Sequence, residues 1–162
     1  GINIDGQFLR TDPKVGYVVI DVTADEEQTT SLREAMASGD FTAADVKHVN
    51  AHATSTPVGD IPEATALRAA FGSATDDMAV SATKSMTGHL LGAAGAIEAV
   101  MTVLAVHEHK APATINLEHQ DPQIDLDVVT QARDLPAGEI VAVSNSFGFG
   151  GHNSVAAFRW VN

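Results

Sequence analysis

Two histidines, a lysine and a glycine-rich loop are the residues of this sequence whose types and spacing suit chemistry. His52 follows a short apolar run, and Lys84 and His89 lie five positions apart in the segment 80–89. The run 147–151 reads Phe-Gly-Phe-Gly-Gly. Neutral imidazoles and glycine backbone amides can donate hydrogen bonds to a developing oxyanion, and a loop of this composition can also act as a gate. These residue types indicate carbon–carbon bond formation on thioesters, which proceeds through an enolate.

Lys84 needs a negatively charged partner if it enters a partly buried site. Glu98 lies in the apolar stretch 90–107, where an ionised carboxylate without a cation would be costly. We therefore expect Lys84 and Glu98 to form an ion pair. The histidines at positions 48, 107, 109 and 119 are expected to be ordinary core or surface residues.

The composition excludes several classes of function. The 162 residues suit one domain, and 44% hydrophobic residues suffice for a packed core. Nine Lys and Arg against 21 Asp and Glu give a formal net charge of −12, which argues against a nucleic-acid partner. The absence of cysteine excludes disulfides and cysteine-based zinc sites. Neither a signal peptide nor an apolar run of about 18 residues occurs, so we expect a cytoplasmic protein without a membrane span.

Alternating strands and helices must position the candidate residues. The pattern predicts a helix that starts with Asp60 as its N-cap and ends near Phe71, and a loop over 84–89. The glycine-containing apolar helix at 90–107 is expected to be buried between layers. Because three chemical segments each follow a strand, their loops are expected to converge at one edge of a mixed sheet in an α/β sandwich. The other predicted elements are strands at 15–22, 46–52, 78–82, 124–129, 139–144 and 154–160, and a helix at 25–38.

Four separated motifs carry a family resemblance between about residues 46 and 158. They are Val49-Asn50-Ala51-His52 through Asp60, Lys84-Ser85-Met86-Thr87-Gly88-His89 through Glu98, Pro112-Ala113-Thr114-Ile115-Asn116, and Asn145 through Asn153. In this order they resemble the C-terminal half of a β-ketoacyl-acyl-carrier-protein synthase of the elongating, type II kind. The resemblance implies one half of a thiolase-like layered α/β/α fold with a mixed sheet, and a homodimeric complete enzyme.

The resemblance also implies roles for individual residues. His52 and His89 would bind the extender thioester and promote its decarboxylation, with Lys84 paired to Glu98. Thr54 and Thr56 would line the malonyl and pantetheine end of the site. Phe149, flanked by Gly148 and Gly150, would be the gating phenylalanine at the oxyanion hole. The reaction needs no metal or organic cofactor, because the substrate arrives on the phosphopantetheine of acyl carrier protein. The nucleophilic cysteine would lie in an N-terminal half, which is missing here, so the chain alone is expected to be inactive in condensation.

Some features depart from the family pattern. Ala53 stands where the family generally has glycine, and a β-carbon disfavours positive φ. Residues 1–40 fit poorly and are expected to be a lead-in of one strand and one helix, with the synthase half at 41–162. Because Gly1 is not a natural start, we expect the sequence to begin within a longer chain or after processing.

Alternative functions remain open at this point. One is a non-catalytic partner subunit of the chain-length-factor type, which need not keep His52, Lys84 and His89 together. Others are a polyketide or mycolic-acid-type ketosynthase, and a half domain that only decarboxylates malonyl thioesters. The paired histidines argue against the initiating synthases, and the absence of cysteine argues against the biosynthetic thiolases.

Overall fold

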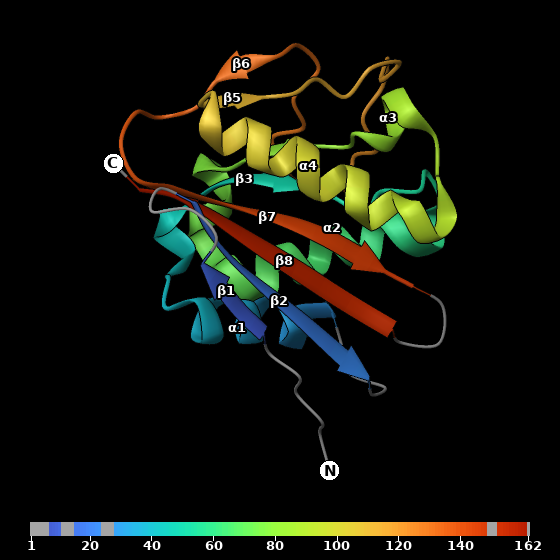
Figure 1. The fold of residues 1–162 in the computed structure, drawn as a ribbon. Helices are drawn as coiled ribbons and strands as arrows, with labels where there is room; N and C mark the ends of the chain where they lie inside the picture. Colours follow the sequence, from blue (N-terminus) through green and yellow to red (C-terminus); the bar gives the residue numbers. More distant parts are fainter. Residues whose placement is uncertain (1–6, 11–14, 24–27, 149–151, 162) are drawn as a thin grey trace.

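A mixed β-sheet forms the centre of the fold (Figure 1). The computed structural model describes residues 7–10, 15–23, 28–148 and 152–161. Within these ranges the main sheet has six strands in the order β1-β2-β8-β7-β3-β4. β3 runs parallel to β4 and β7, whereas the other neighbouring pairs are antiparallel. The strands are β1 Gln7–Arg10, β2 Val15–Thr23, β3 Val46–Asn50, β4 Ala79–Ser81, β7 Ile140–Phe147 and β8 His152–Trp160, and a separate small sheet pairs β5 Lys110–Ala111 with β6 Arg133–Asp134.

Helices cover both faces of this sheet, α1 and α2 on one face and α4 on the other (Figure 1). Side chains alternate along β7 because successive residues of a strand point to opposite faces. Val141 and Val143 pack in the core under α1 and α2, whereas Ile140 and Ala142 pack in the core under α4. The three layers agree with the predicted α/β sandwich. The helices are α1 Gln28–Gly39, α2 Pro57–Phe71, α3 Lys84–Thr87 and α4 Ala94–His107, with 3₁₀ turns at Ala43–Asp45, Gly72–Asp77 and Leu91–Ala93.

Most of the predicted elements are confirmed. The strands expected at 15–22, 46–52, 78–82, 139–144 and 154–160 correspond to β2, β3, β4, β7 and β8. The helix expected at 25–38 corresponds to α1, and its predicted first turn falls partly outside the described residues. The division of the chain near residue 40 stays a prediction. No helix among the described residues is long and apolar enough to cross a membrane.

The strand predicted at 124–129 is wrong. Within the described residues, one isolated parallel bridge, between Val80 and Val128, joins this segment to the sheet. Several backbone carbonyl groups of this segment accept hydrogen bonds from side chains instead of from a neighbouring strand. Gln120 donates to the carbonyls of Ile124 and Leu126, and Arg68 of α2 donates to the carbonyl of Asp125. Apolar alternation therefore marks a segment with one buried side and does not establish strand pairing.

The predicted N-cap at Asp60 is also wrong, because α2 begins one turn earlier. Thr56 is the N-cap residue and Pro57 occupies the first turn, where its fixed φ suits a helix and its missing N–H costs nothing. Asp60 lies inside that turn. Its Oδ1 atom accepts the backbone N–H groups of Ser55, at 3.1 Å, and Thr56, at 3.4 Å. The carboxylate thus braces the loop that enters the helix.

The segment from 84 to 107 differs from its prediction in two ways. Residues Lys84–Thr87 form the short helix α3 where a loop was expected, and Gly88 ends it with a φ of 72°. The apolar helix begins at Ala94, after a 3₁₀ turn, and one side of it packs on the sheet. Its other side exposes Val100, at 58%, and Leu104, at 53%. Burial of this helix between two layers is therefore not observed within the described part of the chain.

Candidate active site

The candidate residues meet at the C-terminal ends of β3 and β4. His52 lies two residues beyond β3, and Lys84 opens α3 shortly after β4. Because these strands are parallel neighbours, their C-terminal ends lie at the same edge of the sheet. A backbone hydrogen bond from Ala51 to Ser81, of 2.8 Å, continues the pairing past the end of β3. The predicted convergence of His52 and Lys84 is confirmed.

Lys84 links His52 to Glu98 through a single ammonium group. Its Nζ atom lies 2.5 Å from Oε1 of Glu98 and 3.3 Å from Nδ1 of His52. Lys84 is 7% exposed and Glu98 is 1% exposed, so the ion pair predicted from the sequence exists and is buried. Burial raises the pKa of Glu98, while the hydrogen bond and the charge of Lys84 oppose that rise.

The hydrogen bonds assign a tautomer to each candidate histidine. An ammonium group only donates, so Nδ1 of His52 must accept from Lys84 and the ring proton lies on Nε2. The backbone N–H of Leu91 donates to Nδ1 of His89 over 3.2 Å, which again leaves the proton on Nε2. The two ring centroids are 5.6 Å apart, with an angle of 89° between the ring planes. The site therefore holds two neighbouring imidazoles whose Nε2–H groups can donate.

His52 is neutral at physiological pH. Burial, followed by the charge of Lys84 and the electrostatic interaction with the neighbouring His89 ring, lowers its pKa to about 4. A neutral imidazole keeps the lone pair on Nδ1 that accepts the hydrogen bond from Lys84. The surroundings of His52 thus favour a hydrogen-bond donor over an imidazolium ion.

Glu63 of α2 holds the main chain at His52, a role that sequence reasoning missed. It is 3% exposed and accepts the backbone N–H groups of His52, at 2.8 Å, and Ala53, at 2.9 Å. It also accepts the side-chain amide of Asn145 at 2.9 Å. Ala53 has a φ of 34°, the positive value that makes glycine the easier residue at this position. The sequence places Glu63 in a helical turn, and no local signal reveals its distant partners.

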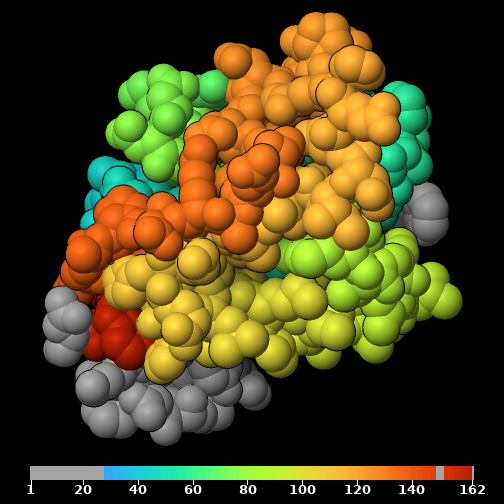
Figure 2. All heavy atoms as spheres, turned by 90° about the horizontal axis from the view of Figure 1, so that it is seen from above, coloured from blue at the N-terminus to red at the C-terminus, as the bar shows by residue number. Residues whose placement is uncertain are grey.

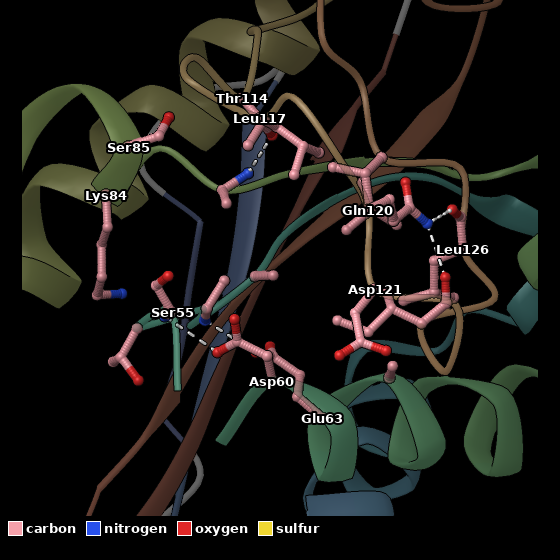
Figure 3. A pocket seen from close by; sticks show the side chains of 18 of the residues that line it. Ser55, Asp60, Glu63, Lys84, Ser85, Thr114, Leu117, Gln120, Asp121 and Leu126 are labelled. Atoms are coloured by element: carbon pink, nitrogen blue, oxygen red, sulfur yellow. Dashed lines mark hydrogen bonds between the residues drawn. The ribbon is translucent and has the colours of Figure 1, made fainter. Parts of the chain in front are cut away.

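A cavity of about 610 Å³ opens beside these residues, and its wall includes Lys84 and His89 but not His52. Thr54 and Thr56 line it, with their hydroxyl oxygens 3.3 Å apart. Both threonines crowd Gly59, where an added β-carbon would lie 2.8 Å from the Thr56 hydroxyl. In the view from above, Figure 2 shows the segment 112–139 spread beside α4 and α3. Figure 3 shows Lys84 and Ser85 on one side of the cavity and Gln120, Asp121 and Leu126 on the other, with Asp60 and Glu63 on α2 below.

The glycine-rich loop is described only in part. Phe149 and Gly150 lie outside the described residues. The backbone N–H of Gly148 donates to the carbonyl of His152 over 2.7 Å, which closes the ladder between β7 and β8. Phe147 lies near the site, with its ring centroid 6.4 Å from that of His52. Among the described residues, no group of three or more His, Asp or Glu side chains is arranged to hold a metal ion.

Comparisons with known proteins show which family the chain belongs to. Residues 14–118 match the family described as "Beta-ketoacyl synthase, C-terminal domain". The chain is 56% identical over 115 residues to 3-oxoacyl-[acyl-carrier-protein] synthase 2 of Synechocystis sp., covering 70% of this chain and 27% of that protein. It is 46% identical over 135 residues to the protein of the same name from Staphylococcus aureus, covering 83% of this chain and 32% of that protein. The match thus covers between about a quarter and a third of the length of these relatives.

Solved structures support the same relationship. One match is the structure titled "AntDE:AntF (apo): type II PKS acyl-carrier protein in complex with its ketosynthase bound to the hexaketide", with a TM-score of 0.81 and 29% identity over 91% of this chain and 38% of that one. Another is "The ishigamide ketosynthase/chain length factor", with a TM-score of 0.78 and 27% identity over 92% of this chain and 38% of that one. The predicted thiolase-like α/β class is therefore confirmed. The chain belongs to the β-ketoacyl synthase family and carries the family's C-terminal domain.

Proposed function

We propose that this chain supplies the His52, His89 and Lys84 part of a condensing acyltransferase of fatty acid synthesis. The observation that carries the proposal is the pair of neighbouring imidazoles, each with Nδ1 bonded to a donor and its ring proton on Nε2. Two such donors suit the oxygen of a thioester that becomes an enolate. The names of the relatives support the same reaction class.

In the proposed reaction, a malonyl thioester on acyl carrier protein loses carbon dioxide. The electron pair of the broken carbon–carbon bond moves into the thioester, and His52 and His89 donate from Nε2 to the resulting enolate oxygen. The enolate carbon then attacks the carbonyl carbon of an acyl group held on a cysteine, and the cysteine leaves as a thiolate. Lys84 keeps His52 in the donating tautomer, and Glu98 balances the charge of Lys84.

The remaining predicted residues belong to the binding of the carrier's arm. Thr54 and Thr56 present two hydroxyl groups at the cavity wall, which suits the amides of a phosphopantetheine. Gly148, Phe149 and Gly150 would complete the oxyanion hole and the gate. We assign no other cofactor, because the chemistry needs only a thioester, hydrogen-bond donors and a thiolate.

The cysteine must come from another part of the enzyme, since this sequence contains none. The outer side of α4 exposes the apolar side chains of Val100 and Leu104, and the turn before this helix exposes Leu91, at 79%. We assign this surface to packing against the N-terminal part that the longer relatives contain, within a homodimer. A non-catalytic chain-length-factor role is less well supported, because it does not require His52, Lys84 and His89 together.

A chimaera tests the proposal. The matching C-terminal segment of the Synechocystis synthase is replaced by this chain, and product is measured with acyl- and malonyl-carrier protein. We expect a 3-oxoacyl product and one carbon dioxide per condensation. Lys84→Met should lower the rate, whereas Lys110→Met, at an exposed ion pair outside the site, should not. A folded chimaera that forms no 3-oxoacyl product would refute the assignment.

A further inference from the structure

A buried polar network lies beneath the candidate site and joins three separate elements. The Asn50 side chain, at the end of β3, donates to the Thr102 hydroxyl at 3.3 Å and to the carbonyl of Glu98 at 3.2 Å. The Thr83 hydroxyl donates to Oδ1 of Asn50 at 2.9 Å, and the Thr102 hydroxyl donates to the carbonyl of Glu98 at 2.7 Å. Asn50 is 1% exposed, and both threonines are 0% exposed. Both ends of the Asn50 amide group are therefore satisfied away from water.

Each member of the network is close in sequence to a residue of the site. Asn50 lies two residues before His52, Thr83 lies directly before Lys84, and Thr102 lies one helical turn after Glu98. The network thus connects the three segments that carry the imidazole, the ammonium and the carboxylate. Directional hydrogen bonds in a dry interior fix such spacings more narrowly than apolar contacts do.

We propose that Asn50, Thr83 and Thr102 are positioning residues that set the distance between the Lys84 ammonium and Nδ1 of His52. Their hydrogen bonds end on one another and on the main chain at Glu98, so they act through the placement of β3, α3 and α4. The inference rests on the proposed function for its meaning in catalysis. If the ammonium moved away, His52 would lose the donor that selects its Nε2–H tautomer.

The charged and titratable groups around His52 make its pKa a measure of this distance. Burial lowers the pKa of His52 most, and Lys84 on α3 and His89 in the following segment lower it further. Glu63 of α2 accepts the backbone N–H of His52, and Glu98 of α4 binds the Lys84 ammonium. Phe147 of β7 packs nearby without charge. Retreat of the Lys84 ammonium would therefore raise the pKa of His52.

The test is an NMR titration of the His52 ring in the chain without substrate. Thr83→Val keeps the side-chain shape and removes the hydroxyl, and we expect the His52 pKa to rise by on the order of one unit. Thr83→Ser keeps the hydroxyl and should leave the pKa unchanged. Thr75→Val is the matched control, because Thr75 is 1% exposed and its hydroxyl bonds to Gly72 and Arg68, away from the site.

A double-variant comparison shows whether the effect passes through Lys84. In a Lys84→Met background, Thr83→Val should no longer change the His52 pKa, because the ammonium whose distance from His52 affects that pKa is absent. If Thr83→Val does not fold, Thr102→Val replaces it, since Asn50 then keeps its bond to the Glu98 carbonyl. An unchanged His52 pKa in a folded network variant, or an equal rise in Thr75→Val, would overturn the proposal. Because no turnover is measured, this outcome is independent of whether the chain takes part in condensation.

Discussion

Replacing Lys84 with methionine should destabilise the protein in a way that depends on pH. The substitution replaces the stem of the lysine side chain by one of the same shape that lacks the ammonium, and it leaves the Glu98 carboxylate, 1% exposed, without its cation. Removing one partner of a buried ion pair typically costs about 3–5 kcal/mol. We expect a loss of this size at pH 7.5, measured as the free energy of unfolding in urea.

The sign of the pH dependence follows from Glu98. Burial raises the pKa of this carboxyl, and Lys84 opposes the rise, so the variant has a higher folded pKa than the natural protein. The folded variant then binds more protons than the unfolded chain, and its stability falls as the pH rises through the folded pKa. Between the two pKa values the loss grows by about 1.4 kcal/mol per pH unit. The penalty should therefore be much smaller at pH 5 than at pH 7.5.

Two controls isolate the effect. Lys110→Met removes the cation from an exposed pair, with side chains 56% and 89% exposed, and should change stability by less than about 1 kcal/mol. The double variant Lys84→Met, Glu98→Gln removes the titration of Glu98 from the pH dependence of stability and keeps any titration of His52. A Lys84→Met penalty that is the same at pH 5 and pH 7.5, or no larger than that of Lys110→Met, would refute the reasoning.

Three further predictions concern other parts of the chain. His48 is fully buried, and burial lowers its pKa to about 4, so its resistance to protonation should remove about 2–3 kcal/mol of stability as the pH falls from 6.5 to 4.5. In urea unfolding, His48→Gln should reduce this loss of stability at acid pH. The same loss in the variant would contradict the prediction. Ala53→Gly should raise the free energy of unfolding by roughly 1 kcal/mol because it relieves a positive φ, whereas Ala96→Gly in α4 should lower it by a similar amount; a loss at both positions would show that no strain exists at Ala53. The net charge of −12 should keep binding of the acidic acyl carrier protein weak in calorimetry, and clear binding at low salt would show that this chain carries a docking surface.

The sequence predicts the elements whose patterns are strong and local. The β-branched residues of β2 and β7 indicate strands because their side chains fit a pleated, half-buried surface. The Lys84–Glu98 pair is predictable because an isolated carboxylate in an apolar helix is too costly to leave without a partner. These are cases in which one large energetic term decides the structure.

Other features depend on contacts that no local pattern encodes. Glu63 looks like any first-turn carboxylate, yet it binds the main chain at His52 and the side chain of Asn145, which is 82 residues away. Segment 124–129 has the alternation of a strand, but Arg68 and Gln120 bind its carbonyls. Asn50 and Thr83 precede the chemical residues in the sequence, and only their tertiary contact reveals that they form a network.

Carbon dioxide release from a malonyl thioester is the most direct test of the two histidines. The chimaeric enzyme is compared with its His52→Gln, His89→Gln and His119→Gln variants, since His119 lines the same cavity and is not one of the two paired imidazoles. We predict that each of the first two substitutions lowers the rate by roughly a hundredfold or more, the usual effect of losing one oxyanion donor. The His119 variant should keep the full rate. Full decarboxylation without either His52 or His89 would contradict the assignment of the paired imidazoles.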